Sequence, residues 1–341
     1  MLADVTGVIS ADAESERELL EGLRMIARVS ALCAEMSVQA DPDDPAFFDM
    51  CPPGRMVGGP NPDGNYYIAM IRGDRTYRVT GNRGSTAYLG FQILAGAGLE
   101  PRRMAGYVSD TALPLDAEGD FSLILSAREP SNTAGAQWVQ IPDDACSIVV
   151  REYIGDASTE HPAALHIEVD DAAPPTPLAD AELADQLTAM AWSLLKLSTL
   201  HRTIKPELLT TPNVLLTAQA ADLGSADTTP DNLYMIGTFG LAPGQTLLLE
   251  IEPPNTRYWN VTLENIWHEC IEPRRRHSSV TNRGVEPAAD GKLRIAISDK
   301  DFGHGHWLDT GGRERGFVVL RWLDNPQPPA VTATVLDDGA S

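Results

Sequence analysis

The sequence predicts a mainly β protein made of two duplicated jelly-roll-like β-sandwich domains, with a helical N-terminal segment and a helical bridge. Three observations lead to this prediction. Most of the chain consists of short runs rich in β-branched and aromatic residues, separated by Gly, Pro, Asn and Asp. Only two segments place apolar residues at helical spacing. Several motifs of the first half of the chain also return, in the same order, in the second half.

The two helical segments are residues 14–37 and 178–202, where apolar side chains recur every three or four positions. Pro206 stops the second segment from continuing as a helix. The stretch Asp170–Pro177, with three prolines, has the composition of a linker. We therefore expect a helix near the N-terminus and a second helix that bridges the β domains.

The expected strands fall into two groups, one on each side of the bridge. Each run is bounded by residues that favour turns. The first group is Tyr66–Ile71, Arg75–Thr80, Tyr88–Leu94, Phe121–Ser126 and Ser147–Tyr153. The second group is Tyr234–Phe239, Thr246–Ile251, Tyr258–Ile266, Leu293–Ser298 and Phe317–Leu323. Short strands at this spacing are typical of sandwiches and jelly rolls.

The internal repeat relates the two groups at an offset of about 170 residues. It pairs Tyr66 with Tyr234, Tyr88 with Tyr258, Phe121 with Leu293, Trp138 with Trp307, and Ser147–Tyr153 with Gly316–Trp322. We therefore expect a helical N-terminal segment, an N-terminal β-sandwich, a linker with the helical bridge and a C-terminal β-sandwich, at residues 1–54, 55–172, 173–228 and 229–341.

Charge and composition exclude several classes of function. The chain has 26 basic and 48 acidic side chains and a net charge of −22. Such a surface repels phosphate backbones and anionic lipid surfaces, so we expect neither a nucleic-acid partner nor a membrane partner. No apolar run approaches the roughly 18–20 residues that cross a bilayer. A homo-oligomer is compatible with this composition.

The N-terminus has no basic head of the kind that begins a signal peptide. The four cysteines are widely spaced and form no CxxC pair, which favours buried, reduced thiols. We therefore expect a cytoplasmic protein. The signatures GxSxG, GxxxxGK[ST] and HExxH are missing, which disfavours common serine hydrolases, P-loop NTPases and zincins.

The second half resembles a bacterial family known as domain of unknown function 1214. This resemblance depends on Arg257–Leu263, the Asp290-Gly291 pair, Trp307-Leu308 and the closing Val318–Leu323. In the first half, Gly59–Tyr66 is similar to the Asn- and Asp-rich start of a companion module, domain of unknown function 1254. Together the resemblances cover about residues 55–155 and 230–325, and they imply paired jelly-roll-like domains. Where the family pattern has Asn before the tryptophan, this chain has His306.

The segment Gly303–Trp307 places His304 and His306 two residues apart. On a strand, both imidazoles would face the same side and could reach one divalent metal ion, the cofactor to consider here. His268 and Glu269 offer further ligands or acid–base groups. The alternative is a glycine-rich structural loop around Trp307. If the protein is an enzyme, these four residues are the candidates, and hydrolase or lyase chemistry suits them.

A cluster of arginines follows Pro273, with no acidic residue from 273 to 285. Arg274 and Arg276 could hold an anionic group, because guanidinium groups form paired hydrogen bonds with carboxylates and phosphates. The alternative is a solvated turn whose arginines pair with acids elsewhere.

Asp63, Asn65 and Tyr66 mark a turn that recurs at Asp231, Asn232 and Tyr234. Asp and Asn cap turns through their own backbone, so a structural role is sufficient, and a ligand-binding role is the alternative. Trp307 and the other aromatic residues could stack a sugar ring, although their places in apolar strands favour core packing.

These observations lead to two hypotheses. In the first, the protein binds, and can transform, a small organic molecule of anionic or carbohydrate-like character in a pocket on or between the β domains. In the second, the duplicated sandwich is a non-catalytic module for protein interaction or oligomerisation.

Overall fold

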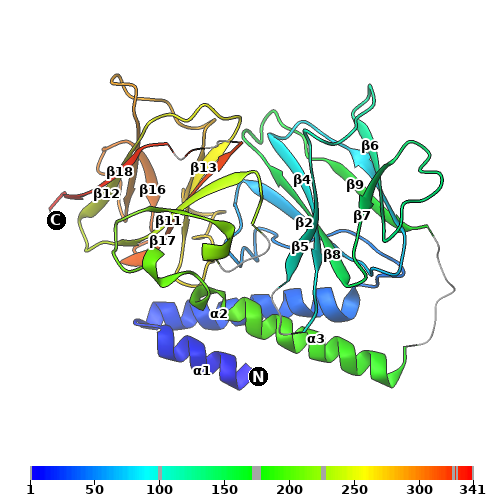
Figure 1. The fold of residues 1–341 in the computed structure, drawn as a ribbon. Helices are drawn as coiled ribbons and strands as arrows, with labels where there is room; N and C mark the ends of the chain where they lie inside the picture. The colour runs from blue at the N-terminus through cyan, green and yellow to red at the C-terminus, as the bar shows by residue number, and fades with distance from the viewer. Residues whose placement is uncertain are drawn as a thin grey trace. The chain divides into compact units, whose positions relative to one another are not determined.

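The computed structural model describes residues 2–98, 102–170, 178–223, 228–324, 327 and 329–339 (Figure 1). The chain forms two compact units. The first unit contains the residues up to Arg55 and those of Gly64–Thr199. The second contains Met56–Asp63 and most of the chain from Leu200 onward. Of the expected linker, residues 171–177 lie outside the described residues.

The three α-helices of the described residues belong to the first unit. They are α1 (Leu2–Asp12), α2 (Glu16–Ala34), which continues as a π-helical turn over Glu35–Gln39, and α3 (Asp180–Ser198). α2 begins at Glu16 because the Ser15 hydroxyl accepts the Glu18 N–H at 3.2 Å. No helix within the described residues is long and apolar enough to span a membrane.

Both expected helices are confirmed, at 16–34 and 180–198. α1 was not expected. Only Val5 and Ile9 are buried on it, and two apolar residues do not make a readable stripe.

The first unit carries two sheets of a sandwich. One sheet has the order β1 (Phe48–Asp49), β2 (Gly64–Met70), β8 (Ala145–Tyr153), β4 (Tyr88–Ala95) and β5 (Arg103–Ser109). The other has the order β7 (Gln137–Gln140), β6 (Asp120–Ser126), β3 (Tyr77–Asn82) and β9 (Ala164–Val169).

The second unit repeats this plan. Its five-stranded sheet has the order β10 (Leu216–Ala218), β11 (Asn232–Gly240), β17 (Arg315–Leu323), β13 (Trp259–Glu264) and β14 (Ser279–Thr281). Its four-stranded sheet has the order β16 (His306–Asp309), β15 (Leu293–Ser298), β12 (Gln245–Ile251) and β18 (Val331–Asp337).

The two units therefore share one strand order, which confirms the predicted fold class and its duplication. In each unit the same pair runs parallel, β6 with β7 and β15 with β16, while the other strand pairs are antiparallel. The central strands were all expected from the sequence. Edge strands such as β5 and β18 were not expected, and both are partly exposed.

The core of the second unit lies between its two sheets. Along β17, every second residue from Val318 to Trp322 enters this core, together with Trp259 and Leu263 of β13. The alternate residues of β17 point to the opposite face. There, Phe317 and Val319 pack with Tyr234 and Ile236 of β11 and with Ile204, Leu208 and Ala218, which precede β11. Both faces of this sheet are therefore buried, and this places polar side chains of β13 inside the unit.

Candidate functional site

The outer face of β13 carries polar side chains that are buried. Since Trp259, Val261 and Leu263 enter the core, Asn260, Thr262 and Glu264 point to the outer face. All six residues of the strand are buried. On the neighbouring strand β17, Arg321 lies opposite Asn260 and is also buried. A polar sheet face normally meets water, so this buried one needs partners from elsewhere.

The segment Met56–Asp63 lies on this face and bonds to the loop after β13. Val57 forms an antiparallel bridge with Glu269. The Gly59 N–H donates to the His268 carbonyl at 2.9 Å, and the Cys270 thiol donates to the Pro60 carbonyl at 3.1 Å. Gly59 has a left-handed φ of 69°, and a Cβ there would sit 3.4 Å from a carboxylate oxygen of Glu264. Glycine thus lets the segment pass close to that carboxylate.

Glu264 holds two cationic or ionisable partners at once. The Nδ1 atom of His268 lies 2.8 Å from Glu264 Oε2, and Nη2 of Arg321 lies 3.5 Å from Oε1. The same Arg321 nitrogen donates to the Gly59 carbonyl at 2.8 Å. The three side chains are almost fully buried, so the charges of Glu264 and Arg321 interact in a low dielectric.

The His268 ring is held on two sides. It stacks on Phe317 with ring centroids 4.1 Å apart, and Glu264 accepts the proton of Nδ1. Its other nitrogen, Nε2, is closed to solvent and makes no hydrogen bond.

The backbone of His268 is strained, with a φ of 58°. The strain is held by a turn built on Asn265, whose side-chain oxygen accepts the N–H groups of Trp267 and Glu269, both at 3.0 Å. The Asn265 carbonyl accepts the His268 N–H at 3.1 Å. Left-handed non-glycine residues are more frequent at functional sites than elsewhere.

A second set of polar contacts lies along the same face. Asn61 Oδ1 accepts the Asp63 backbone N–H at 3.0 Å and the Asn260 amide at 2.6 Å. The Asn61 amide donates to the Tyr258 hydroxyl, and the Asn260 amide also donates to Thr262 at 2.9 Å. The remaining oxygen, Asn260 Oδ1, is closed to solvent and has no hydrogen-bond partner.

Asp63 ends this set of contacts. Its Oδ1 accepts the Ser279 hydroxyl at 3.3 Å, whereas Oδ2 is closed to solvent and makes no hydrogen bond. Burial raises the pKa of the Asp63 carboxyl, and the neighbouring Ser279, Asn260 and Arg321 only partly offset this. We call the six residues of the two sets the β13 cluster: Asn61, Asp63, Asn260, Glu264, His268 and Arg321.

Two residues singled out from the sequence, His268 and Asp63, are members of the β13 cluster. Glu269 follows His268 but its side chain goes elsewhere, to the Asn265 amide at 3.2 Å. The structure thus separates the neighbouring His268 and Glu269 and brings His268 together with Glu264.

His304 and His306 have different partners. His304 Nε2 lies 2.5 Å from Asp338 Oδ1, and His306 Nε2 lies 3.2 Å from the backbone of Glu286. β16 begins only at His306, so His304 lies in the loop before it. Among the described residues, no three His, Cys, Asp or Glu side chains converge as metal ligands would.

The two candidate arginines differ in exposure. Arg274 is exposed. Arg276 is half-buried and bonds to Glu272 at 3.0 Å and to Asp309 at 2.8 Å, so two carboxylates balance its charge. Trp307 is half-buried and donates its indole N–H to the Ser298 carbonyl at 3.3 Å.

Asn65 and Tyr66 belong to the first unit, unlike Asp63. Tyr66 is buried beneath the Arg151 guanidinium, which lies 5.7 Å from the ring centroid. In the second unit, Tyr234 and Arg321 repeat this pair at 6.0 Å. The duplicated tyrosine therefore has a duplicated packing role.

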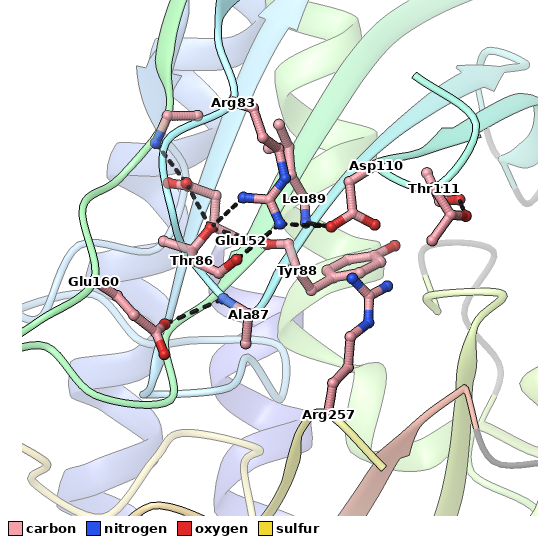
Figure 2. Close-up of polar contacts among 12 residues, drawn as sticks. Arg83, Thr86, Ala87, Tyr88, Leu89, Asp110, Thr111, Glu152, Glu160 and Arg257 are labelled. Carbon is pink, nitrogen blue, oxygen red and sulfur yellow. Dashed lines mark hydrogen bonds and ion pairs between the residues drawn. The ribbon is translucent and has the colours of Figure 1, made fainter. Parts of the chain in front are cut away.

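Asn65 donates to Glu152 Oε2 at 3.1 Å. Glu152 belongs to a polar network of the first unit that includes Thr86, Arg83 and Asp110 (Figure 2). Glu152 also accepts the Thr86 hydroxyl at 3.2 Å and the Ala163 N–H at 2.6 Å. Arg83 joins Asp110 at 2.5 Å and the Thr86 carbonyl at 2.7 Å. Burial raises the pKa of Glu152. Both Glu152 oxygens have partners in this network, which indicates that it holds loops in place.

Sequence reasoning missed Glu264, Arg321, Asn61 and Asn260. The available signal was the alternation of polar and apolar residues from Trp259 to Glu264, which also fits a strand with one face in water.

The first unit shows which of these residues the fold does not require. Gly90 lies opposite Arg151 as Asn260 lies opposite Arg321, so the position equivalent to Glu264 is occupied by Leu94. The same strand order therefore forms without the carboxylate, and the Glu264–His268 pair is specific to the second unit.

Replacing Glu264 by Gln removes the charge that the buried Arg321 and His268 face. We expect Glu264→Gln to lower the free energy of unfolding by roughly 3 kcal/mol, because a buried charge then loses its partner. Urea denaturation followed by tryptophan fluorescence measures this, since four of the six tryptophans lie in the second unit. Glu252→Gln, at an exposed carboxylate, is the control. A loss no larger than in the control would contradict this account.

The raised pKa of the Asp63 carboxyl predicts how the stability of the protein changes with pH. This pKa is raised in the folded state, so the contribution of Asp63 to stability is present below its unfolded pKa and is lost as the pH rises through its folded pKa. The melting temperature of Asp63→Asn minus that of the wild type should therefore increase from about pH 4 to about pH 7. Thermal unfolding followed by circular dichroism measures it, and a constant or falling difference would refute the assignment.

Comparison with solved structures supports the fold. A structure of an uncharacterised protein from Burkholderia cenocepacia is similar, with a TM-score of 0.91 and 28% identity over 98% of this chain and 94% of that one. A protein from Vibrio parahaemolyticus has the same fold, with a TM-score of 0.55 and 11% identity over 91% of this chain and 96% of that one. No curated protein matches the chain. Residues 241–328, which include β13 and β17, match the family described as protein of unknown function (DUF1214).

Proposed function

We propose that the protein binds a small organic molecule at the β13 cluster of its second unit. One observation carries the proposal: Asp63 Oδ2, Asn260 Oδ1 and His268 Nε2 are closed to solvent and make no hydrogen bond. An unsatisfied buried polar atom costs about 1–3 kcal/mol, and most such atoms in proteins have partners. A molecule that supplies these partners would therefore bind favourably.

The proposal extends to chemistry on the bound molecule, of the hydrolase or lyase type. Glu264 accepts the proton of His268 Nδ1, which leaves Nε2 as the nitrogen able to take up a proton. His268 would be the acid–base group and Glu264 the positioning residue that holds its ring.

Two further expectations accompany this proposal. The wide spacing of the four cysteines favours a cytoplasmic location. The motif Gly59–Tyr66 supports a relation of the N-terminal half to domain of unknown function 1254.

Ligand-observed NMR on a mixture of simple sugars, polyols, amines and carboxylic acids tests binding at the cluster. We expect saturation transfer to at least one compound in the wild type, and an affinity at least tenfold lower in Asp63→Asn and His268→Asn, since each loses a polar contact worth about 1.4 kcal/mol. Asn is chosen at 268 because it tolerates a positive φ.

Glu252→Gln serves as the control and should bind like the wild type. Circular dichroism verifies that each variant is folded. The proposal fails if no compound binds, or if the cluster variants bind as well as the control.

A second candidate function is self-association through the helices of the first unit. α2 and α3 lie side by side (Figure 1), and both expose leucines. Leu20 is 59% exposed, Leu183 37% and Leu187 51%. Grouped exposed apolar side chains favour a protein partner, and a second copy of this chain would bury the same surface on both sides.

The double variant Leu183→Glu/Leu187→Glu tests self-association. We expect the wild type to be a dimer and the variant a monomer in size-exclusion chromatography with light scattering, because the acidic side chains cannot be buried in the interface. Leu115→Glu, at another exposed leucine of the first unit, should leave the mass unchanged. A monomeric wild type would exclude this function.

A further inference from the structure

We infer that the molecule bound at the β13 cluster is neutral and rich in hydroxyl groups, as simple sugars and polyols are. This inference rests on the proposed function, and it assigns the chemical class that the proposal leaves open. It follows from which atoms of the cluster lack partners and from the charges around them.

The orientation of the two asparagine amides is determined by a backbone donor. The Asp63 N–H must meet an oxygen, so the atom of Asn61 that faces it is Oδ1. The atom of Asn260 that lies 2.6 Å from this oxygen must then be the nitrogen. The atom of Asn260 that remains without a partner is therefore its oxygen, which accepts hydrogen bonds.

The other two unpaired atoms are acceptors as well. In the neutral tautomer of His268 whose Nδ1–H is donated to Glu264, Nε2 carries a lone pair and accepts hydrogen bonds. Burial raises the pKa of Asp63, whereas Ser279, Asn260 and Arg321 lower it, and in its ionised form Oδ2 only accepts hydrogen bonds. The three atoms thus call for hydrogen-bond donors, and a hydroxyl group is a neutral donor.

The charges of the cluster disfavour an anion. Glu264 and Asp63 are acidic, and the guanidinium group of Arg321 lies close to both. Arg321 already donates to the Gly59 carbonyl and faces Glu264. An added carboxylate or phosphate would meet unpaired acceptors, in a protein of net charge −22. A neutral molecule avoids this repulsion.

Three compounds of one size separate the classes: glucose is neutral, glucosamine carries an ammonium group and glucuronate a carboxylate. Binding of each, and of the neutral polyols sorbitol and inositol, is measured by isothermal titration calorimetry at low salt and neutral pH. We expect at least one neutral compound to bind, with glucuronate bound at least tenfold more weakly than glucose.

The variant Asp63→Asn distinguishes a ligand-binding role of Asp63 from a purely structural one, through the affinities for glucose and glucuronate. Removing the carboxylate should weaken binding of the neutral compound. It should also reduce the difference in affinity between glucose and glucuronate. Glu252→Gln removes one exposed charge from the same unit. It should change neither the affinity for the neutral compound nor the difference in affinity between glucose and glucuronate.

The outcomes separate this inference from the function on which it rests. Glucuronate binding as tightly as glucose, or glucosamine binding tenfold more tightly, overturns the assigned class and leaves the binding function in place. Failure of every neutral compound to bind also overturns the class. The NMR mixture, which includes amines and acids, then decides separately whether the cluster binds any small molecule.

Discussion

The buried carboxylate of Glu264 is the constraint on which the polar architecture of the second unit depends. It lies on a strand whose two faces are both buried, so water cannot solvate its charge. His268 and Arg321 take its two oxygens, and Gly59 leaves room for it. The segment Met56–Asp63 and the turn on Asn265 are therefore parts of one arrangement that solvates a single charge.

The duplication separates what the fold requires from what the second unit adds. Both units keep the same strand order and the same tyrosine–arginine pair, which packs on the outer face of the five-stranded sheet. The first unit has Leu94 where the second has Glu264. Its buried carboxylate, Glu152, has partners on both oxygens and holds loops. In the second unit, buried polar atoms of Asp63, Asn260 and His268 lack hydrogen-bond partners within one cluster, and we therefore propose that binding takes place there.

The sequence predicted the fold well and the candidate site only in part. Period-two patterns and repeated turns are local, so the central strands and the duplication could be read directly. His268 and Asp63 were recognised as polar residues worth attention, but in separate hypotheses, because some 200 residues lie between them. His304 and His306 are close in sequence, yet the loop before β16 directs them to different partners.

The sequence by itself determined the β-rich class, the two helices beyond α1, and the repeat of one strand pattern at about 170 residues. These follow from residue spacing, which acts over a few positions. Only the tertiary structure decided that the polar face of β13 is buried, because the residues that cover it come from Met56–Asp63 and the chain after Leu200. The alternation of Asn260, Thr262 and Glu264 is the same whether a strand faces water or protein, and burial alone turns these side chains into a candidate site.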